Sequence, residues 1–226
     1  MTDEAPATLT SASLVYERLR TDILQGALKA SAKLRIDGLR ERYGVGPIPL
    51  REALNRLLAE GFVALEDRKG FYVPAVSLDE LRELTQTRYW LNELVVRESL
   101  KAGDTRWEER VILATHYLSR TPRVFGGNTG AINPEWERRH RDFHLALMEA
   151  CPSRWLKDYH ANLFDCADRY RHQYLSATAE VRAREVADEH IGMGDLALAR
   201  DTDGLISAYN LHISQTTEII IRSVKA

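Results

Sequence analysis

Four histidines and one arginine occupy apolar, helix-spaced positions in the second part of the chain. His140 and His144 lie four residues apart, so both point to the same side of one helix. His190 and His212 lie on the apolar faces of two later helical stretches, and Arg88 lies on that of an earlier one. Because burying a polar or charged group without a partner costs several kcal/mol, these side chains are expected to meet at one site.

Two explanations fit the four histidines. In the first, His140, His144, His190 and His212 together hold one divalent ion, since imidazole nitrogen is a common ligand for such metals. In the second, each imidazole is neutral and hydrogen bonded inside the core. Four imidazoles on converging helices favour the first explanation. The other histidines show no such convergence and are expected at the surface or in ordinary packing: His116, His160 and His172.

The helices that position these side chains are predicted from apolar spacing and from capping signals. Ser77 and Glu80 form a capping box, so a helix begins there after a short linker. From that point the chain is helical to its end, with breaks at proline and glycine. Residues 77–226 are therefore expected to form an all-α bundle. The expected helices are 78–101, 105–119, 134–150, 153–175, 179–199 and 203–223.

Residues 34–62 have the layout of a helix-turn-helix. Asp37 is expected to cap a first helix, and Gly44 to end it, since glycine tolerates the left-handed conformation that ends helices. Pro49 fits the first turn of a second helix, where its missing N–H costs nothing. Arg51 and Asn55 lie opposite the apolar stripe of that helix, so their face is expected to enter a DNA major groove. The stripe consists of Leu50, Leu54, Leu57 and Leu58, and Gly61 follows it.

The segments on either side complete a winged helix-turn-helix over residues 13–76. Residues 1–12 are expected to be a disordered tail, and a helix over 14–24, capped by Ser11 or Ser13, to follow it. After the second helix, two β-prone runs flank a polar turn and predict a hairpin. The tip of this wing carries the expected DNA contacts Arg68, Lys69 and Gly70. The expected fold class is thus mainly α, with one small hairpin.

Composition sets few limits on function. The net charge is −2, and residues 1–76 hold 11 Lys/Arg against 10 Asp/Glu, so charge alone does not suggest DNA. No apolar run approaches the roughly 20 residues that span a membrane, and the acidic N-terminus lacks the apolar core of a signal peptide. Cys151 and Cys166 have neither zinc-knuckle nor redox spacing, so a reducing cytoplasm is the expected location.

The N-terminal motifs resemble those of GntR-type bacterial regulators. The resemblance covers roughly residues 14–75 and includes Pro-Leu-Arg-Glu-Ala-Leu at 49–54 and Arg-Lys-Gly-Phe-Tyr-Val at 68–73. It implies that Arg35 and Arg51 contact DNA and that Gly70 approaches the minor groove. Most relatives carry Ser-Arg-Thr where this chain has Gly-Pro-Ile at 46–48, so the operator is expected to differ from the common family consensus.

Residues 78–222 resemble the FCD ligand domain of the FadR-type branch of that family. Phe-His-Leu-Ala-Leu-Met-Glu-Ala-Cys at 143–151 and Asp-Glu-His at 188–190 carry the resemblance. It implies a zinc or nickel site at His144, His190 and His212, with His140 at the position of the family's aspartate. Replacing that aspartate by histidine removes a negative charge and favours borderline metals.

The same resemblance implies that Arg88 holds the carboxylate of an organic acid, which the planar guanidinium suits. Arg169, Tyr170 and Arg171 are further candidates, with two of the three expected to face solvent. The glycine-rich turn and the histidine-for-aspartate change are similar to those of the glutarate-responsive CsiR regulators, a similarity that points toward dicarboxylates.

The expected function is a homodimeric, ligand-responsive repressor that binds a palindromic double-stranded DNA operator. An alternative is a metal-dependent hydrolase or lyase fused to a winged helix, but no His-Glu-x-x-His motif or phosphate-binding loop is present in the sequence. A constitutive architectural protein is a third possibility, and the inward position of Arg88 argues against it.

Overall fold

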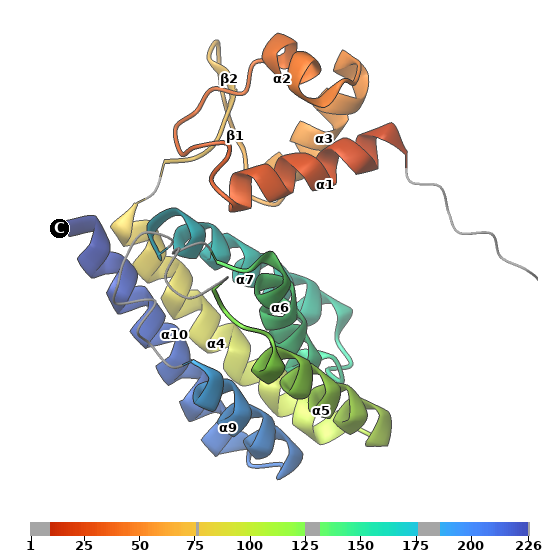
Figure 1. Cartoon of the computed structure of the whole chain (residues 1–226), viewed down its shortest axis with the longest axis vertical. Coiled ribbons are helices and arrows are strands. Elements are labelled where there is room, and N and C mark those ends of the chain that lie inside the picture. The colour runs from red at the N-terminus through yellow and green to blue at the C-terminus, as the bar shows by residue number, and fades with distance from the viewer. Residues whose placement is uncertain (1–9, 76, 125–131, 176–185, 226) are drawn as a thin grey trace, which may run out of the picture. The chain divides into compact units, whose positions relative to one another are not determined.

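The computed structural model describes residues 10–75, 77–124, 132–175 and 186–225, which form two compact units on either side of residue 76. The first unit contains helices and a hairpin, and the second is built from helices (Figure 1). The predicted tail up to residue 9 and positions 179–185 of a predicted helix lie outside the described residues.

The N-terminal unit is a winged helix-turn-helix, as predicted. It consists of α1 (Ser11–Leu24), α2 (Ile36–Tyr43) and α3 (Pro47–Ala59), followed by β1 (Ala64–Glu66) and β2 (Gly70–Tyr72). The two strands pair in antiparallel register (Figure 1). The mainly α fold class is confirmed.

The predicted stripe and turn of the helix-turn-helix are confirmed. Leu50, Leu54 and Leu57 are fully buried, whereas Leu58 is partly buried. Gly44 ends α2 in the left-handed conformation with φ of 68°, which a residue with a β-carbon adopts only with strain. The sharp turn this allows brings α3 against α2.

The helix starts differ from the prediction. Thr10 caps α1 by accepting a hydrogen bond from the Ser13 N–H, so Ser11 lies inside the helix and neither serine is the cap. Residues 11 and 12 therefore belong to α1 and not to the predicted tail. Asp37 lies in the first turn of α2 and makes no cap, because the helix begins one residue before it.

Pro49 lies in the first turn of the second helix of the motif, as predicted. Pro47 is the first residue of α3 and Pro49 the third, and Gly46 precedes the helix in an extended conformation. Both prolines are tolerated because the first helical turn has no acceptors for its own N–H groups.

The C-terminal unit is the predicted all-α bundle. Ser77 caps its first helix, with Oγ accepting a hydrogen bond from the Glu80 N–H at 3.3 Å. In order, the described helices are α4 (Leu78–Ala102), α5 (Thr105–Arg120), α6 (Pro134–Met148), α7 (Arg154–Leu175), α9 (Ala187–Leu198) and α10 (Thr202–Lys225). Helix α4, the first of this unit, packs against α7 and α10, and the next helix, α5, packs against α6 and α9.

The core of this unit holds α6 in place beside the candidate site. Trp107 of α5 is fully buried and donates its indole N–H to the Ala146 carbonyl oxygen at 2.9 Å. Phe143 and Leu147 of α6 are fully buried in the same cluster. None of the helices that the structure describes is long and apolar enough to cross a membrane.

Candidate functional site

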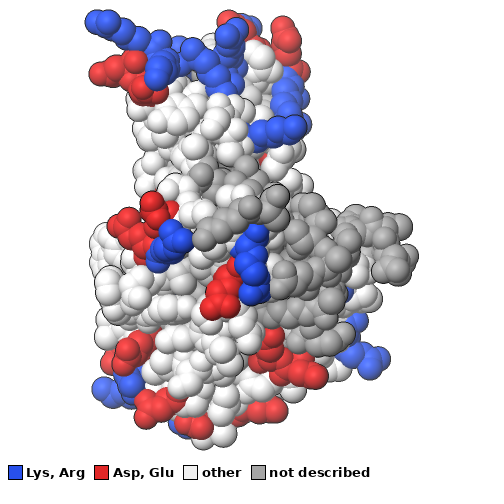
Figure 2. Space-filling model, turned by 90° about the vertical axis from the view of Figure 1, so that its left-hand side faces the viewer, with Lys and Arg blue, Asp and Glu red and all other residues white. Residues whose placement is uncertain are grey.

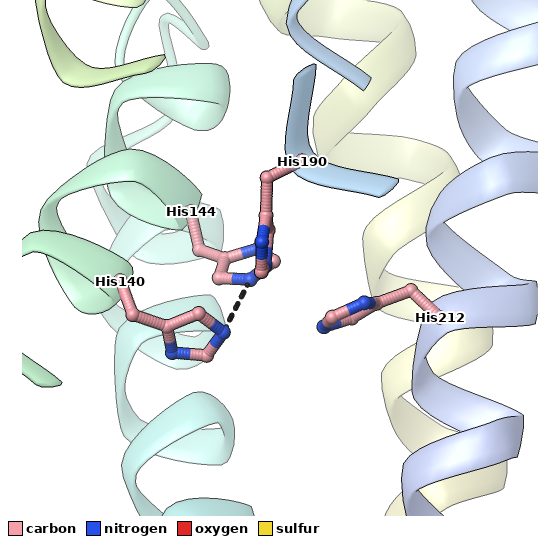
Figure 3. A group of neighbouring side chains, drawn as sticks. All are labelled: His140, His144, His190 and His212. Atoms are coloured by element: carbon pink, nitrogen blue, oxygen red, sulfur yellow. Dashed lines mark hydrogen bonds between the residues drawn. The ribbon is translucent and has the colours of Figure 1, made fainter. Parts of the chain in front are cut away.

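The four predicted histidines meet inside the C-terminal unit. His140 and His144 extend from α6, His190 from α9 and His212 from α10, and their rings face one another (Figure 3). All four side chains are buried, and each offers a ring nitrogen within 4.8 Å of those of the others. The ring centroids are separated by 4.5 Å at the closest pair and 6.1 Å at the farthest. One ion is within reach of all four side chains.

Two hydrogen bonds orient these rings. The Nε2 atoms of His140 and His144 lie 3.0 Å apart. On the other side, Nδ1 of His212 lies 2.7 Å from Oε2 of Glu189. A carboxylate only accepts, so His212 donates from Nδ1 and keeps the lone pair of Nε2. Figure 3 shows one ring nitrogen of His212 directed toward the other histidines.

The protonation of the site follows from its burial. Burial lowers the pKa of His140 and His144 well below the ordinary histidine value, and the neighbouring imidazoles lower it further. Both rings are therefore neutral near pH 7, with a lone pair on one nitrogen. Neutral imidazole is the form that binds metals, and it is also the form that hydrogen bonds inside a core. The neutral form of the rings is therefore compatible with both explanations, a metal site and hydrogen-bonded histidines in the core.

Arg88 lines the same cavity as the histidines, as predicted. The cavity has a volume of about 60 Å³, room for a few small groups. Arg88 is partly buried, and its guanidinium carbon lies 5.8 Å from the Phe164 ring centre. Burial lowers its pKa, and the electrostatic influence of the nearby Tyr209 opposes that effect. The cavity is also lined by polar side chains that the sequence had not marked: Thr85, Arg123, Asp168, Thr216 and Thr217.

A buried ion network borders this cavity. Arg171 donates to Glu137 and, at 2.6 Å, to Asp168, while Nε2 of His172 lies 3.2 Å from Glu137 and 3.3 Å from Asp168. Burial alone would raise the pKa of Asp168, but Arg171 and His172 outweigh it and hold that pKa well below its usual range. Burial would lower the pKa of His172, but the two carboxylates raise it to about 9. Two carboxylates and two cations thus balance one another.

Several sequence predictions about α7 were wrong. Arg169, Tyr170 and Arg171 are all buried, although two of the three were expected to face solvent. His172 belongs to the ion network and is not an ordinary packing residue. These side chains are buried because partners on other helices match their charge: Glu137 of α6 pairs with Arg171, and Glu80 of α4 lies 3.9 Å from Arg169.

The other two histidines match the expectation. His160 is buried and hydrogen bonds the Tyr209 hydroxyl at 3.4 Å. Burial lowers its pKa to about 3, with Arg88 adding to the effect. His116 is exposed on α5. Neither lies among the four converging rings.

The predicted DNA-contacting residues lie on the surface of the N-terminal unit. Arg35, Arg51 and Asn55 are exposed. Arg35 is the residue before α2, and its neighbour Leu34 donates a backbone N–H to Phe71 of the wing at 2.8 Å, which ties the two parts together. Figure 2 shows Lys and Arg side chains gathered at one end of this unit, with Asp and Glu side chains beside them, and both kinds also occur on the visible face of the other unit.

The wing tip combines positive charge with an unusual backbone. Arg68 and Gly70 have positive φ angles of 66° and 82°, which makes the turn tight. Lys69 is exposed and lies 2.5 Å from the Glu66 carboxylate, so part of its charge is balanced within the hairpin. Arg68 is therefore the stronger candidate of the two for a phosphate contact.

Comparison with known proteins assigns each unit to a family. Residues 11–73 match bacterial regulatory proteins of the gntR family, and residues 83–215 match the FCD domain. The chain is 36% identical over 205 residues to the uncharacterized HTH-type transcriptional regulator BphR of Paraburkholderia xenovorans, covering 91% of this chain and 83% of that one. It is 32% identical over 207 residues to the HTH-type transcriptional repressor GlaR of Escherichia coli, covering 91% and 93% of the two chains.

Solved structures show the same fold. The structure of E. coli McbR/YncC superimposes with a TM-score of 0.78 at 21% identity, covering 95% of this chain and 99% of that chain. A GntR regulator from Rhodococcus sp. RHA1 superimposes with a TM-score of 0.71 at 18% identity, covering 93% and 97%. The combination of a winged helix and an all-α bundle is therefore shared with these proteins.

Proposed function

The chain belongs to the GntR family of regulators with an FCD domain, and we propose that it is a repressor controlled by a divalent metal ion and a small carboxylate. The family and the matched relatives are transcriptional regulators and not enzymes, so DNA-binding transcriptional regulation is the chain's function. The metal, the carboxylate and the sign of regulation are the proposed parts.

One observation carries this proposal. Four buried histidines face one another in the wall of a cavity that also contains the guanidinium of Arg88. A core that needed only to be stable would fill this volume with apolar side chains, because each buried polar group loses its hydration. Nitrogen ligands and an anion-binding group in one cavity instead suit a metal ion and a carboxylate.

The geometry of the histidines fits a metal ion. Two ligand nitrogens about 2.1 Å from one tetrahedral ion are about 3.4 Å apart, so the Nε2 atoms of His140 and His144, hydrogen bonded at 3.0 Å, would need only a small separation to hold an ion in place of the shared proton. The pairing of His212 with Glu189 is the carboxylate–histidine arrangement found behind many metal ligands. Zinc or nickel suits a set of neutral imidazoles, and either ion would supply positive charge in the cavity that Arg88 lines.

Replacing Glu189 by alanine should weaken zinc binding about 10- to 100-fold, because His212 then loses the carboxylate that fixes its tautomer. Competition with a chromophoric zinc indicator measures this change. Asp188→Ala, at an exposed position of the same helix, is the matched control and should leave the affinity unchanged. Equal zinc affinity in the Glu189→Ala and wild-type proteins would show that this carboxylate does not support a metal ligand.

The ligand is proposed to be a small organic acid, and a dicarboxylate fits best. Arg88 would hold one carboxylate through two parallel hydrogen bonds. Arg123 lines the same cavity, with its guanidinium carbon 5.1 Å from the Trp136 ring centre, and suits a second carboxylate. Arg171 also lines the cavity, and Glu137 and Asp168 accept its hydrogen bonds.

We further propose that two copies of the chain bind a palindromic operator and that the acid weakens this binding. A single helix-turn-helix reads only a few base pairs, so dimers on inverted half-sites are the usual solution. The relative GlaR of Escherichia coli is named a repressor, and this supports repression, rather than activation, by the present chain. Operators can be selected from random double-stranded DNA with the full-length protein, and their affinity can then be measured with and without organic acids.

Replacing Arg51 by alanine should weaken binding to the selected DNA about 10-fold or more, since one arginine–base or arginine–phosphate contact is worth about 1–3 kcal/mol. Arg51 is exposed on α3, so the fold should be unaffected. Fluorescence anisotropy gives the affinity, and Arg82→Ala, at an exposed arginine of α4, is the control. Unchanged affinity in Arg51→Ala would remove this residue from the DNA interface.

A further inference from the structure

The first turn of α3 is apolar and exposed. Ile48 is 78% exposed, the highest value among the large apolar side chains in the described part of the chain. It stands between Pro47, which is also exposed, and Pro49. A single exposed apolar residue is common on protein surfaces and carries little meaning by itself. Its place on the helix decides what it can contact.

The same turn has few backbone donors. A helix leaves its first four N–H groups without partners inside the helix, and these often bind phosphate. Here the first and third residues, Pro47 and Pro49, have no N–H, and the preceding Gly46 has no side chain to act as a cap. This end of α3 is therefore poorly suited to binding a phosphate group.

Ile48 shares a face with the polar residues of α3. Arg51 and Asn55 follow it by three and seven residues, which places all three on one side of the helix, and all three are exposed. Leu50, Leu54 and Leu57 on the opposite side are fully buried. If Arg51 and Asn55 enter a major groove, Ile48 enters it with them, at the end of the helix that contacts base edges in such motifs.

The major groove presents one apolar group on its base edges, the C5 methyl group of thymine. We propose that Ile48 packs against this methyl group in each half-site and so selects thymine over cytosine at one position. The proposal rests on the insertion of α3 into the groove. It assigns sequence reading to an apolar side chain in a segment, residues 46–48, that carries neither a hydroxyl nor a guanidinium group.

Replacing thymine by deoxyuridine tests this directly, because only the methyl group is removed. Each thymine of DNA selected from a random library by the full-length protein is replaced in turn, and affinity is measured by fluorescence anisotropy. Wild-type protein should lose about fourfold in affinity at one thymine per half-site, the effect of one buried methyl group. The protein with Ile48→Ala should bind the thymine and deoxyuridine forms equally.

Leu14→Ala is the matched control, because Leu14 is a similarly exposed aliphatic side chain on α1 and should leave the deoxyuridine penalty intact. The proposal is overturned if no thymine shows a penalty, or if Ile48→Ala keeps the wild-type penalty. Circular dichroism melting verifies that both variants fold. Arg51→Ala shows whether only the role of Ile48 fails or the insertion of α3 as a whole. If Arg51→Ala also binds the selected DNA with wild-type affinity, α3 does not enter the major groove.

Discussion

Replacing His190 by alanine should remove the bound metal ion. The wild-type protein, purified without chelator or nickel resin, should contain about one divalent ion per chain by elemental analysis. His190 is the only one of the four histidines that α9 supplies, and the other three cannot reposition without moving α6 or α10. The expected loss of affinity is at least about 100-fold, since even changes to groups behind a ligand cost 10- to 100-fold.

The thermal stability of the protein provides a second measurement. A ligand at 100 times its dissociation constant stabilises the folded state by about 2.7 kcal/mol. For a protein of this size, that corresponds to a rise of roughly 5–10 °C in melting temperature. Zinc or nickel added to metal-free wild-type protein should produce such a rise, and the same addition to His190→Ala should produce little.

His116→Ala is the control for both measurements, because His116 is an exposed histidine on α5. It should keep the wild-type metal content and the wild-type response to added metal. Two results would contradict the proposal. One is metal-free wild-type protein whose melting temperature and DNA affinity do not change when metal is added. The other is His190→Ala protein that retains the full metal content. Either result would leave the four histidines as a neutral, hydrogen-bonded group within the core.

Local sequence patterns predicted the fold and the convergence of the histidines well. Helical spacing placed His140 and His144 on the buried face of α6, and the same rule placed His190 and His212 on the buried faces of two other helices. Such inferences succeed because one rule, the burial of a continuous apolar stripe, sets the orientation of a whole helix. The wing was predictable for a similar reason, since Gly70 marks a turn between two β-prone runs.

Features that depend on partners from other helices were not predictable. Arg171 was one of three neighbouring candidates on α7, two of which were expected to face solvent. Its burial depends on Glu137, which lies 34 residues earlier in the chain and on another helix. The pairing of Glu189 with His212 spans 23 residues and was missed for the same reason. Helix starts were missed at a finer scale: Thr10, and neither Ser11 nor Ser13, caps α1, and α2 begins one residue before Asp37.

Replacing Arg88 by alanine should abolish the response to organic acids. A guanidinium that donates two hydrogen bonds to a carboxylate in a cavity contributes about 3 kcal/mol, so the variant should bind its acid about 100-fold more weakly. A panel of short monocarboxylates and dicarboxylates, tested by thermal shift and by release of selected DNA, identifies the class of ligand. Arg106→Ala, at an exposed arginine of α5, is the matched control and should respond as the wild type does.

Arg123 distinguishes between the two classes of acid. If the ligand is a dicarboxylate, Arg123→Ala should lower the affinity for dicarboxylates and leave that for monocarboxylates of equal length nearly unchanged, because Arg123 lines the cavity with Arg88. Equal thermal shifts in Arg88→Ala and wild-type proteins would remove Arg88 from the site. An acid that binds normally to His190→Ala but not to Arg88→Ala would show that the guanidinium holds the ligand without help from a metal ion. Loss of binding in both variants is the result expected if the metal ion and Arg88 hold one acid together.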